Sequence, residues 1–289
     1  MTDIDTPDEL ASPATGLFET ATDQDAVARA VAAAAPVTVE RVDLAMVSSL
    51  APALRAPIFG LLSTVADNKY VLGRRYAEWC TGAPMLESAV AAAAMAQDEL
   101  GHARSFYPLL RGFPSQHTNG REAPQMEDRG WQQRATSAMT CLDRPFLSWA
   151  EFIAANVVID AALTTLLNSA LTSPYEPLRQ RAAKIVQEEI DHQVHGAGWL
   201  PRIAPAELAP ALERVWDDAF TWLGAADDPL ITPLVSAGLV ADRSDALRDR
   251  LRAQLQAALP PQLANRLLAR ELPWSRWDPF ARRLRSATV

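Results

Sequence analysis

Met95-Ala-Gln-Asp-Glu-Leu-Gly-His-Ala-Arg-Ser-Phe-Tyr107 is the stretch around which this chain is organised. It predicts one buried helix on which Glu99 and His102, three residues apart, lie on the same face. Apolar side chains such as Phe106 share that face, so an unpaired ionised carboxylate there would be strongly disfavoured. A metal ion bound by the carboxylate and the imidazole would remove that penalty.

The same pattern occurs a second time, farther along the chain. Gln187-Glu-Glu-Ile-Asp-His192 repeats the order Gln, acid, Glu, two residues, His that is found in Gln97-Asp-Glu-Leu-Gly-His102. A single Glu-x-x-His motif is weak evidence, because many surface helices carry one. Two such motifs, together with one further carboxylate from each of two other helices, form the four-helix site that binds two iron or manganese ions.

Composition indicates an all-α protein. Apolar residues make up 49% and charged residues 21% of the 289 residues, and alanine-rich amphipathic runs dominate. The net charge of -8 argues against nucleic acid as the main partner. Cys80 and Cys141 are too few for a disulfide framework, and we expect both to be packing residues.

The sequence predicts a cytoplasmic protein that does not enter a membrane. The acidic N-terminal segment has no apolar secretory core. We also find no apolar run of the roughly 18 residues that a membrane span requires.

Helix and turn signals predict a ferritin-like four-helix bundle. Its helices are expected at residues 57–78, 84–110, 145–171 and 176–200, with a long crossover over residues 111–144. Two tight hairpins joined by one long crossover are typical of this fold. The predicted organisation is an N-terminal extension over 1–50, partly disordered, the bundle over 51–235, and a basic helical extension over 236–289.

Hairpin geometry locates the two remaining carboxylates. Residues in an antiparallel helix pair face each other when they are equally far from the turn. Counting back from the turn at 81–84 by the distance to Glu99 gives Asp67, and the same count around the turn at 172–175 leads from Glu189 to Asp160. The alternative for each aspartate is an ordinary solvated helix face.

Two other carboxylates compete for these positions. Glu78 is too close to its turn to reach the level of Glu99, and Glu151 lies nine residues before Asp160. Nine residues correspond to about 13 Å along a helix. Both are therefore poorer candidates. His195 follows the second motif by three residues and is expected at the rim or the surface.

At these residues the chain resembles a known family. Residues 58–200 resemble the phenylacetyl-CoA and benzoyl-CoA epoxidase group of ferritin-like diiron oxygenases, the phenylacetic acid catabolic family. Leu72-Gly-Arg-Arg-Tyr-Ala-Glu-Trp-Cys80 with Ala83-Pro84 resembles the non-catalytic structural subunit. Ala96-Gln-Asp-Glu-Leu-Gly-His102 and Val158-Ile-Asp-Ala-Ala162 resemble the catalytic subunit instead. The mixture suggests a divergent member.

The resemblance implies a ligand set and its supporting residues. Two iron ions, or manganese or a mixed pair, would be bound by Asp67, Glu99, His102, Asp160, Glu189 and His192. Catalytic members usually have glutamate where this chain has Asp67. A metal-bound histidine normally donates its other N–H to a carboxylate. By similarity, Asp98 would hold His192 and Glu188 would hold His102.

The implied activity is a diiron monooxygenase or epoxidase that inserts oxygen from O2 into an aromatic or acyl-CoA thioester substrate. The sequence has no Gly-x-Gly-x-x-Gly motif and no cysteine cluster, so electrons would come from a separate reductase. Two alternatives remain, a ferritin-like ferroxidase and a metal-free structural subunit of a multicomponent phenylacetyl-CoA epoxidase. A homo- or hetero-oligomer is compatible with each of these functions.

The C-terminal segment from Arg243 onward is basic. It carries ten arginines against four acidic residues, a balance of about +6, whereas the rest of the chain is acidic. One hypothesis is that it docks a CoA-type phosphate or an acidic partner, with Arg282, Arg283 and Arg285 as the test residues. The alternative is packing against the acidic N-terminal segment.

Overall fold

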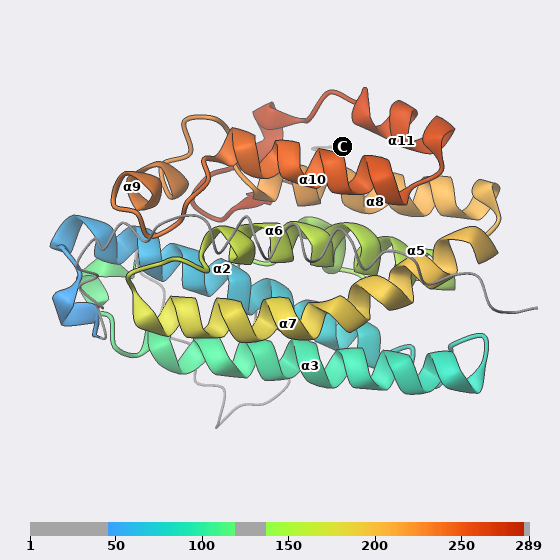
Figure 1. Cartoon of the computed structure of the whole chain (residues 1–289), viewed down its shortest axis with the longest axis horizontal. Coiled ribbons are helices and arrows are strands. Elements are labelled where there is room, and N and C mark those ends of the chain that lie inside the picture. The colour runs from blue at the N-terminus through green and yellow to red at the C-terminus, as the bar shows by residue number, and fades with distance from the viewer. Residues whose placement is uncertain (1–45, 119–136, 286–289) are drawn as a thin grey trace, which may run out of the picture. The chain divides into compact units, whose positions relative to one another are not determined.

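The computed structural model describes residues 46–118 and 137–285, all of which belong to the compact unit Val42–Val289. The predicted N-terminal extension over 1–50 lies mostly outside the described residues, as does the middle of the predicted crossover over 111–144. The described part is almost entirely helical, which confirms the predicted all-α class (Figure 1).

The first hairpin consists of α2 (Pro52–Ala77) and α3 (Leu86–Leu110). Proline stands in the first turn of α2, where its missing N–H has no helical partner to lose. The two helices approach closely at Gly73, where a Cβ atom would lie 2.9 Å from Cβ of Glu99. This close approach is possible only because Gly73 has no side chain.

The second hairpin begins with a helix that contains an irregular turn. Instead of one regular helix at 145–171, the structure has α5 (Trp149–Ala155), a π-helical turn η5 (Asn156–Asp160) and α6 (Ala161–Ser169). Helix α7 (Glu176–Trp199) returns antiparallel to them and lies beside α3 (Figure 1). Single π turns of this kind occur frequently at functional sites.

The segment Trp149–Ser169 corrects one expectation from the sequence. By length and composition alone it is apolar enough to cross a membrane. However, 89% of its most apolar 18-residue stretch is buried inside the protein, as is normal for the central helix of a bundle.

Further helices cover one side of the bundle. Helix α8 (Pro205–Trp222) packs on α5, and α10 (Ser244–Ala258) packs on α6 (Figure 1). The shorter elements are η1 (Val47–Ser49), η2 (Ser115–His117), η4 (Thr140–Leu142), η6 (Leu200–Arg202), α9 (Ile231–Ser236), α11 (Pro261–Leu268), η7 (Trp274–Arg276), β1 (Trp277–Asp278) and β2 (Arg283–Leu284). Strands β1 and β2 pair antiparallel, with Trp277 opposite Leu284.

Candidate metal centre

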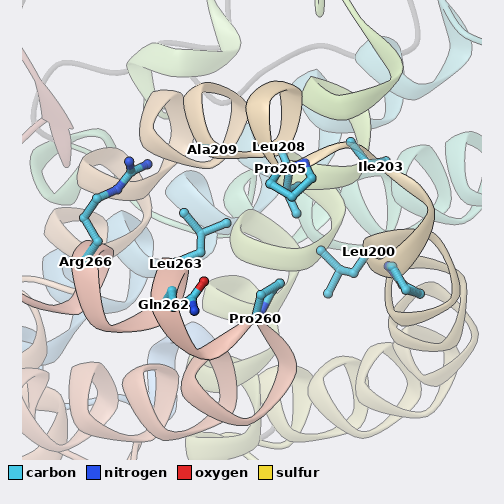
Figure 2. A pocket seen from close by; sticks show the side chains of 10 residues that line it. Leu200, Ile203, Pro205, Leu208, Ala209, Pro260, Gln262, Leu263 and Arg266 are labelled. Atoms are coloured by element: carbon cyan, nitrogen blue, oxygen red, sulfur yellow. The ribbon is translucent and has the colours of Figure 1, made fainter.

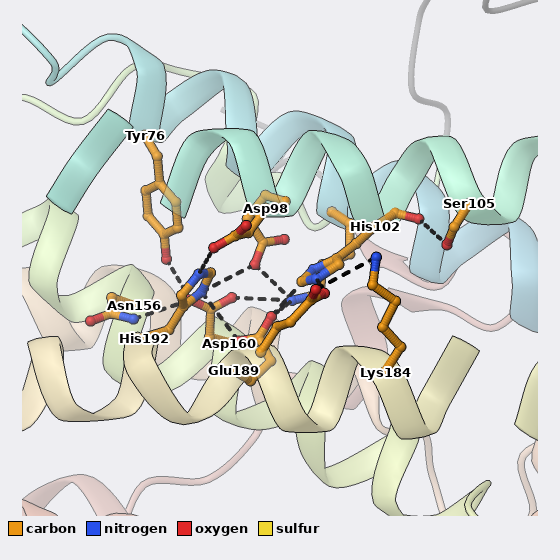
Figure 3. Close-up of polar contacts among 12 residues, drawn as sticks. Tyr76, Asp98, His102, Ser105, Asn156, Asp160, Lys184, Glu189 and His192 are labelled. Atoms are coloured by element: carbon orange, nitrogen blue, oxygen red, sulfur yellow. Dashed lines mark hydrogen bonds and ion pairs between the residues drawn. The ribbon is translucent and has the colours of Figure 1, made fainter. Parts of the chain in front are cut away.

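Two histidines and three carboxylates meet at the centre of the bundle. Each Glu-x-x-His motif lies on one turn of helix, so its two side chains point to the same interior space (Figure 3). The π turn η5 ends at the third carboxylate. The five buried side chains are Glu99 and His102 on α3, Asp160 on η5, and Glu189 and His192 on α7. Five of the six expected ligands therefore lie together.

A lysine occupies the middle of this group. Nζ of Lys69 on α2 lies 2.8 Å from Oε1 of Glu99, 2.5 Å from Oε1 of Glu189 and 3.5 Å from Oδ1 of Asp160. The Lys69 side chain is 0% exposed, so its charge is balanced only by neighbouring protein groups. A buried ammonium of this kind requires paired carboxylates.

The structure does not place Asp67 with the other five expected ligands. Its Oδ1 accepts a hydrogen bond of 2.8 Å from the Tyr107 hydroxyl, and its Oδ2 accepts one of 2.8 Å from the Ser137 backbone N–H. The count from the turn missed the facing position by two residues. Two residues rotate a side chain by about 200° around an α-helix, so Lys69 faces Glu99 and Asp67 points elsewhere.

Each histidine contacts the acidic residue that the resemblance implied. Nε2 of His102 lies 2.9 Å from Oε2 of Glu188, and Nε2 of His192 lies 3.4 Å from Oδ2 of Asp98. Both acids stand beside the partly exposed seam between α3 and α7. These contacts turn the Nδ1 atom of each histidine toward the interior cluster, where Nδ1 of His102 lies 3.5 Å from Oε1 of Glu189.

Two further residues hold Asp160 in place. The Tyr76 hydroxyl donates to Oδ2 of Asp160 over 2.8 Å, and the Asn156 side-chain amide donates to the same oxygen over 3.1 Å. Asn156 and Asp160 are the first and last residues of the π turn. The sequence analysis did not single out Tyr76, Asn156 or Lys69.

The ionisation of the cluster follows from burial and from the opposing charges. Burial disfavours the Lys69 ammonium, but the carboxylates, Glu189 foremost, outweigh burial and raise the pKa of Lys69 above its usual value. Burial raises the pKa of Glu99 well above its usual range, and Lys69 opposes that shift. Burial together with the lysine charge lowers the pKa of His102 to about 2. These shifts favour an ammonium at Lys69 beside a neutral His102, and hydrogen bonds to Asp160, Glu189 and Glu99 outweigh burial and raise the pKa of His192 as well.

The donor set does not fit two metal ions. A dinuclear site in this bundle class uses four carboxylates and two histidines. This cluster has three carboxylates and two histidines, and an ammonium stands in place of the fourth carboxylate. Four residues have donor atoms within 4.8 Å of one another, namely Glu99, Asp160, Glu189 and His192. This spacing suits one cation. The Lys69 ammonium already contacts the three carboxylates among these four residues.

Four donor atoms in the cluster make no hydrogen bond to any described residue. They are Oε2 of Glu99, Nδ1 of His102, Oε2 of Glu189 and Nδ1 of His192. Buried polar atoms are normally paired, and here Nδ1 of His192 lies 3.3–3.5 Å from oxygens of Glu99, Asp160 and Glu189, so these donors face one another where a metal ion would bind. The cluster thus retains most of the donors of a metal site while holding a cation that belongs to the chain.

The rival groups lie outside the cluster. Glu78 pairs with Arg75 at 2.5 Å, and Glu151 pairs with Arg214 at 2.7 Å. His195 stands edge-on to the Trp149 ring, with the ring centroids 5.9 Å apart. The two cysteines are free thiols.

A groove of about 500 Å³ opens elsewhere on the surface, between η6, α8 and α11 (Figure 2). Its walls are apolar residues such as Leu208 and Leu263, with Arg266 at its edge. None of its lining residues belongs to the metal-site cluster.

The test arginines of the C-terminal segment are paired with acidic residues of the same chain. Nη1 of Arg282 lies 2.6 Å from Oδ2 of Asp228, and both side chains are buried. Arg283 pairs with Asp143. Outside the set of test residues, the Arg266 guanidinium of the same basic segment also forms an ion pair, 2.8 Å from the Glu213 carboxylate. These pairs supply an intramolecular role for the basic segment, and its docking to a phosphate stays a prediction.

The sequence of this chain is similar to that of known proteins. Residues 46–277 match the phenylacetic acid catabolic protein family, which is most of the chain. The chain belongs to the phenylacetic acid catabolic protein family. Within this family it is similar to one of the subunits of the 1,2-phenylacetyl-CoA epoxidase of Escherichia coli K12, with 27% identity over 158 residues. The alignment covers 53% of this chain and 62% of that relative, so the chain spans less than two thirds of the relative's length.

Proposed function

We propose that this protein is a subunit of a multicomponent oxygenase that acts on an aromatic acyl-CoA thioester, and that another subunit carries the oxygen-activating metal pair. Membership of the family and similarity to an epoxidase subunit support the complex. The observation that carries the proposal is the ammonium of Lys69 between Glu99 and Glu189. A chain-borne cation supports a structural role for this bundle in the complex.

The cluster has the properties of a structural core. Lys69 on α2 forms ion pairs with carboxylates of α3, η5 and α7, so one ion-pair network connects all four helices of the bundle. Its members are at most 2% exposed. A substrate would have to displace packed side chains to reach it, because protein interiors contain few voids.

Exposed apolar residues on α3 and α7 support assembly with another subunit. Val90 is 62% exposed, Ile190 is 55% exposed and Val194 is 67% exposed. Gly101 is also exposed within α3, and a Cβ atom there would meet nothing within 4 Å. A glycine in a helix interior destabilises the helix by about 1 kcal/mol relative to alanine. Close approach of a partner helix to α3 is a physical reason for a glycine at position 101.

The second candidate is that this chain itself is a diiron oxygenase that receives electrons from a separate reductase. The unpaired donor atoms of Glu99, Glu189 and His192 favour it. When bound, an iron, manganese or mixed pair would supply the activation of O2. In that case Lys69 has to leave the cluster, and a fourth carboxylate has to replace it. A cytoplasmic location is proposed for either candidate.

Oxygen uptake by the full chain separates the candidates. The protein is loaded with Fe(II) under anaerobic conditions, desalted, and analysed for iron before it is mixed with air, a chemical reductant and phenylacetyl-CoA. The structural-subunit proposal expects well under about one iron per chain and no thioester-dependent uptake. About two irons per chain with thioester-dependent uptake would establish the second candidate. Uptake that follows added Fe(II) and ignores the thioester would indicate a ferroxidase.

A further inference from the structure

We propose that Lys69 is a built-in cation that keeps a metal site closed, and that the single substitution Lys69→Glu opens this site to two divalent metal ions. The inference goes beyond the proposed function because it concerns the chain alone. It does not depend on which complex the chain enters or on what that complex acts upon.

The first support is the position of the ammonium. Nζ of Lys69 contacts Glu99, Glu189 and Asp160 at 2.5–3.5 Å, so it lies where their charges converge. Carboxylate oxygens bind first-row divalent ions at about 2.0–2.2 Å. A metal ion at the same point therefore needs the three carboxylates to close in by only a short distance.

The second support is that the remaining donors are already oriented. Asp98 and Glu188 contact the Nε2 atoms of the two histidines, which directs both Nδ1 atoms inward, where each lies 3.3–3.5 Å from an oxygen of Glu189. Tyr76 fixes Asp160 from the opposite side. Such supporting hydrogen bonds are the ones that orient metal ligands in proteins.

The third support is charge. Wild-type Lys69 brings one positive charge to three buried carboxylates. Replacing it with glutamate removes that charge and supplies a fourth carboxylate from α2, which completes a set of four carboxylates and two histidines. Four uncompensated buried carboxylates are strongly unfavourable, and two divalent ions would neutralise them. Lys69→Glu therefore favours metal binding through both its donors and its charge.

The experiment compares Co(II) binding to the full-length wild type, Lys69→Glu and Lys69→Met. Metal per chain is measured after desalting, and the visible absorption of Co(II) reports nitrogen and oxygen ligation. Thermal midpoints are recorded with and without Co(II). The matched control is Arg285→Glu, which makes the same charge change at an arginine side chain that is 66% exposed and contacts Asp278, outside the cluster. Lys69→Glu combined with His192→Ala locates the bound metal.

We expect no retained Co(II) in the wild type or in Arg285→Glu, about one ion in Lys69→Met and about two in Lys69→Glu. Added Co(II) should raise the thermal midpoint of both Lys69 variants and leave the wild type unchanged. His192→Ala should remove the bound metal from Lys69→Glu. The inference is overturned if folded Lys69→Glu retains no metal, or if neither Lys69 variant can be recovered even when expressed with added metal. Retention of about two ions by the wild type would contradict the proposed function as well, so the two failures are distinguishable.

Discussion

Nζ of Lys69 on α2 lies 2.8 Å from Oε1 of Glu99 on the adjacent antiparallel helix α3, and neither side chain is exposed to solvent. The pair stands at the depth where two Glu-x-x-His motifs converge. The bundle therefore holds a cation at its centre that is covalently part of the chain. This arrangement has measurable consequences for stability and for metal binding.

Removing the Lys69 charge should destabilise the protein. In metal-free buffer, Lys69→Met leaves Glu99, Asp160 and Glu189 buried without their shared cation, and breaking a buried ion pair typically costs about 3–5 kcal/mol. Urea unfolding of the variant and the wild type measures the difference. Lys184→Met, at an exposed lysine, is the control and should change stability by less than about 0.5 kcal/mol. Equal stability of both variants would contradict a stabilising role for Lys69.

Asp67 should matter for stability rather than for metal binding. Asp67→Ala leaves the Tyr107 hydroxyl and the Ser137 N–H without an acceptor that they have in the wild type. Loss of hydrogen bonds to a charged group costs about 1.5–3 kcal/mol each. A double-mutant cycle with Tyr107→Phe should give a coupling of about 1–2 kcal/mol. If metal retention by Lys69→Glu depended on Asp67, Asp67 would belong to the site after all.

Glycine substitutions should have opposite effects at two positions. Gly73→Ala places a methyl group 2.9 Å from Cβ of Glu99 and 3.1 Å from the Ala96 carbonyl oxygen, neither of which can move freely. We expect a loss of about 1–3 kcal/mol in the free energy of unfolding. Gly101→Ala, on the open face of α3, should instead gain about 0.5–1 kcal/mol in the isolated chain. Thermal unfolding of both variants is the measurement, and similar effects at the two positions would refute the close-approach explanation.

The buried pair of Arg282 and Asp228 should anchor the C-terminal segment. The pair is 2.6 Å long, and Asp228 also accepts hydrogen bonds from the backbone N–H groups of Leu230 and Ile231. Arg282→Met should cost about 3–5 kcal/mol, because it leaves a buried carboxylate without its partner. Arg285→Met is the control, since Arg285 is 66% exposed and its contact with Asp278 is 3.7 Å long. Limited proteolysis of the two variants measures how firmly the C-terminal segment is held. Equally slow cleavage of this segment in both variants would argue against anchoring by Arg282.

Asp218 should make stability fall as the pH rises from about 4 to 6. Burial raises the pKa of Asp218 to about 6 in the folded chain, whereas an unfolded aspartate has a pKa of about 3.9. Between these values the folded state binds the proton more strongly, so the free energy of unfolding decreases with pH, by up to about 3 kcal/mol. Asp218→Asn keeps an oxygen acceptor for the Thr140 N–H and should remove this decrease. Urea unfolding at several pH values checks it, and parallel curves for the two proteins would contradict the assignment.

The sequence was sufficient for the helices and for most of the cluster. The repeated motif located Glu99, His102, Glu189 and His192, because helical periodicity alone places each pair on one face. Hairpin counting found Asp160. The same count failed for α2, because Lys69 and Glu99 are equally far from residue 84, which lies near the end of the actual turn over 78–85 and not at its middle.

A signal for Lys69 was present in the sequence. Leu62, Val65, Leu72 and Tyr76 are all buried and follow the spacing of one helix face, and Lys69 falls in the middle of that series. Asp67 falls on another face of α2 that is buried too, so burial alone does not separate the two positions. The sequence predicted one regular helix over 145–171 and carried no signal for the π turn at η5.

The most direct test of the central claim is an anomalous-scattering crystal structure of the wild-type protein soaked with Fe(II) under anaerobic conditions. The account predicts no anomalous peak among Glu99, Asp160 and Glu189, with Nζ of Lys69 still within hydrogen-bonding distance of Glu99 and Glu189. Two anomalous peaks in the cluster, with the Lys69 side chain turned away from it, would contradict the claim that the chain supplies its own cation.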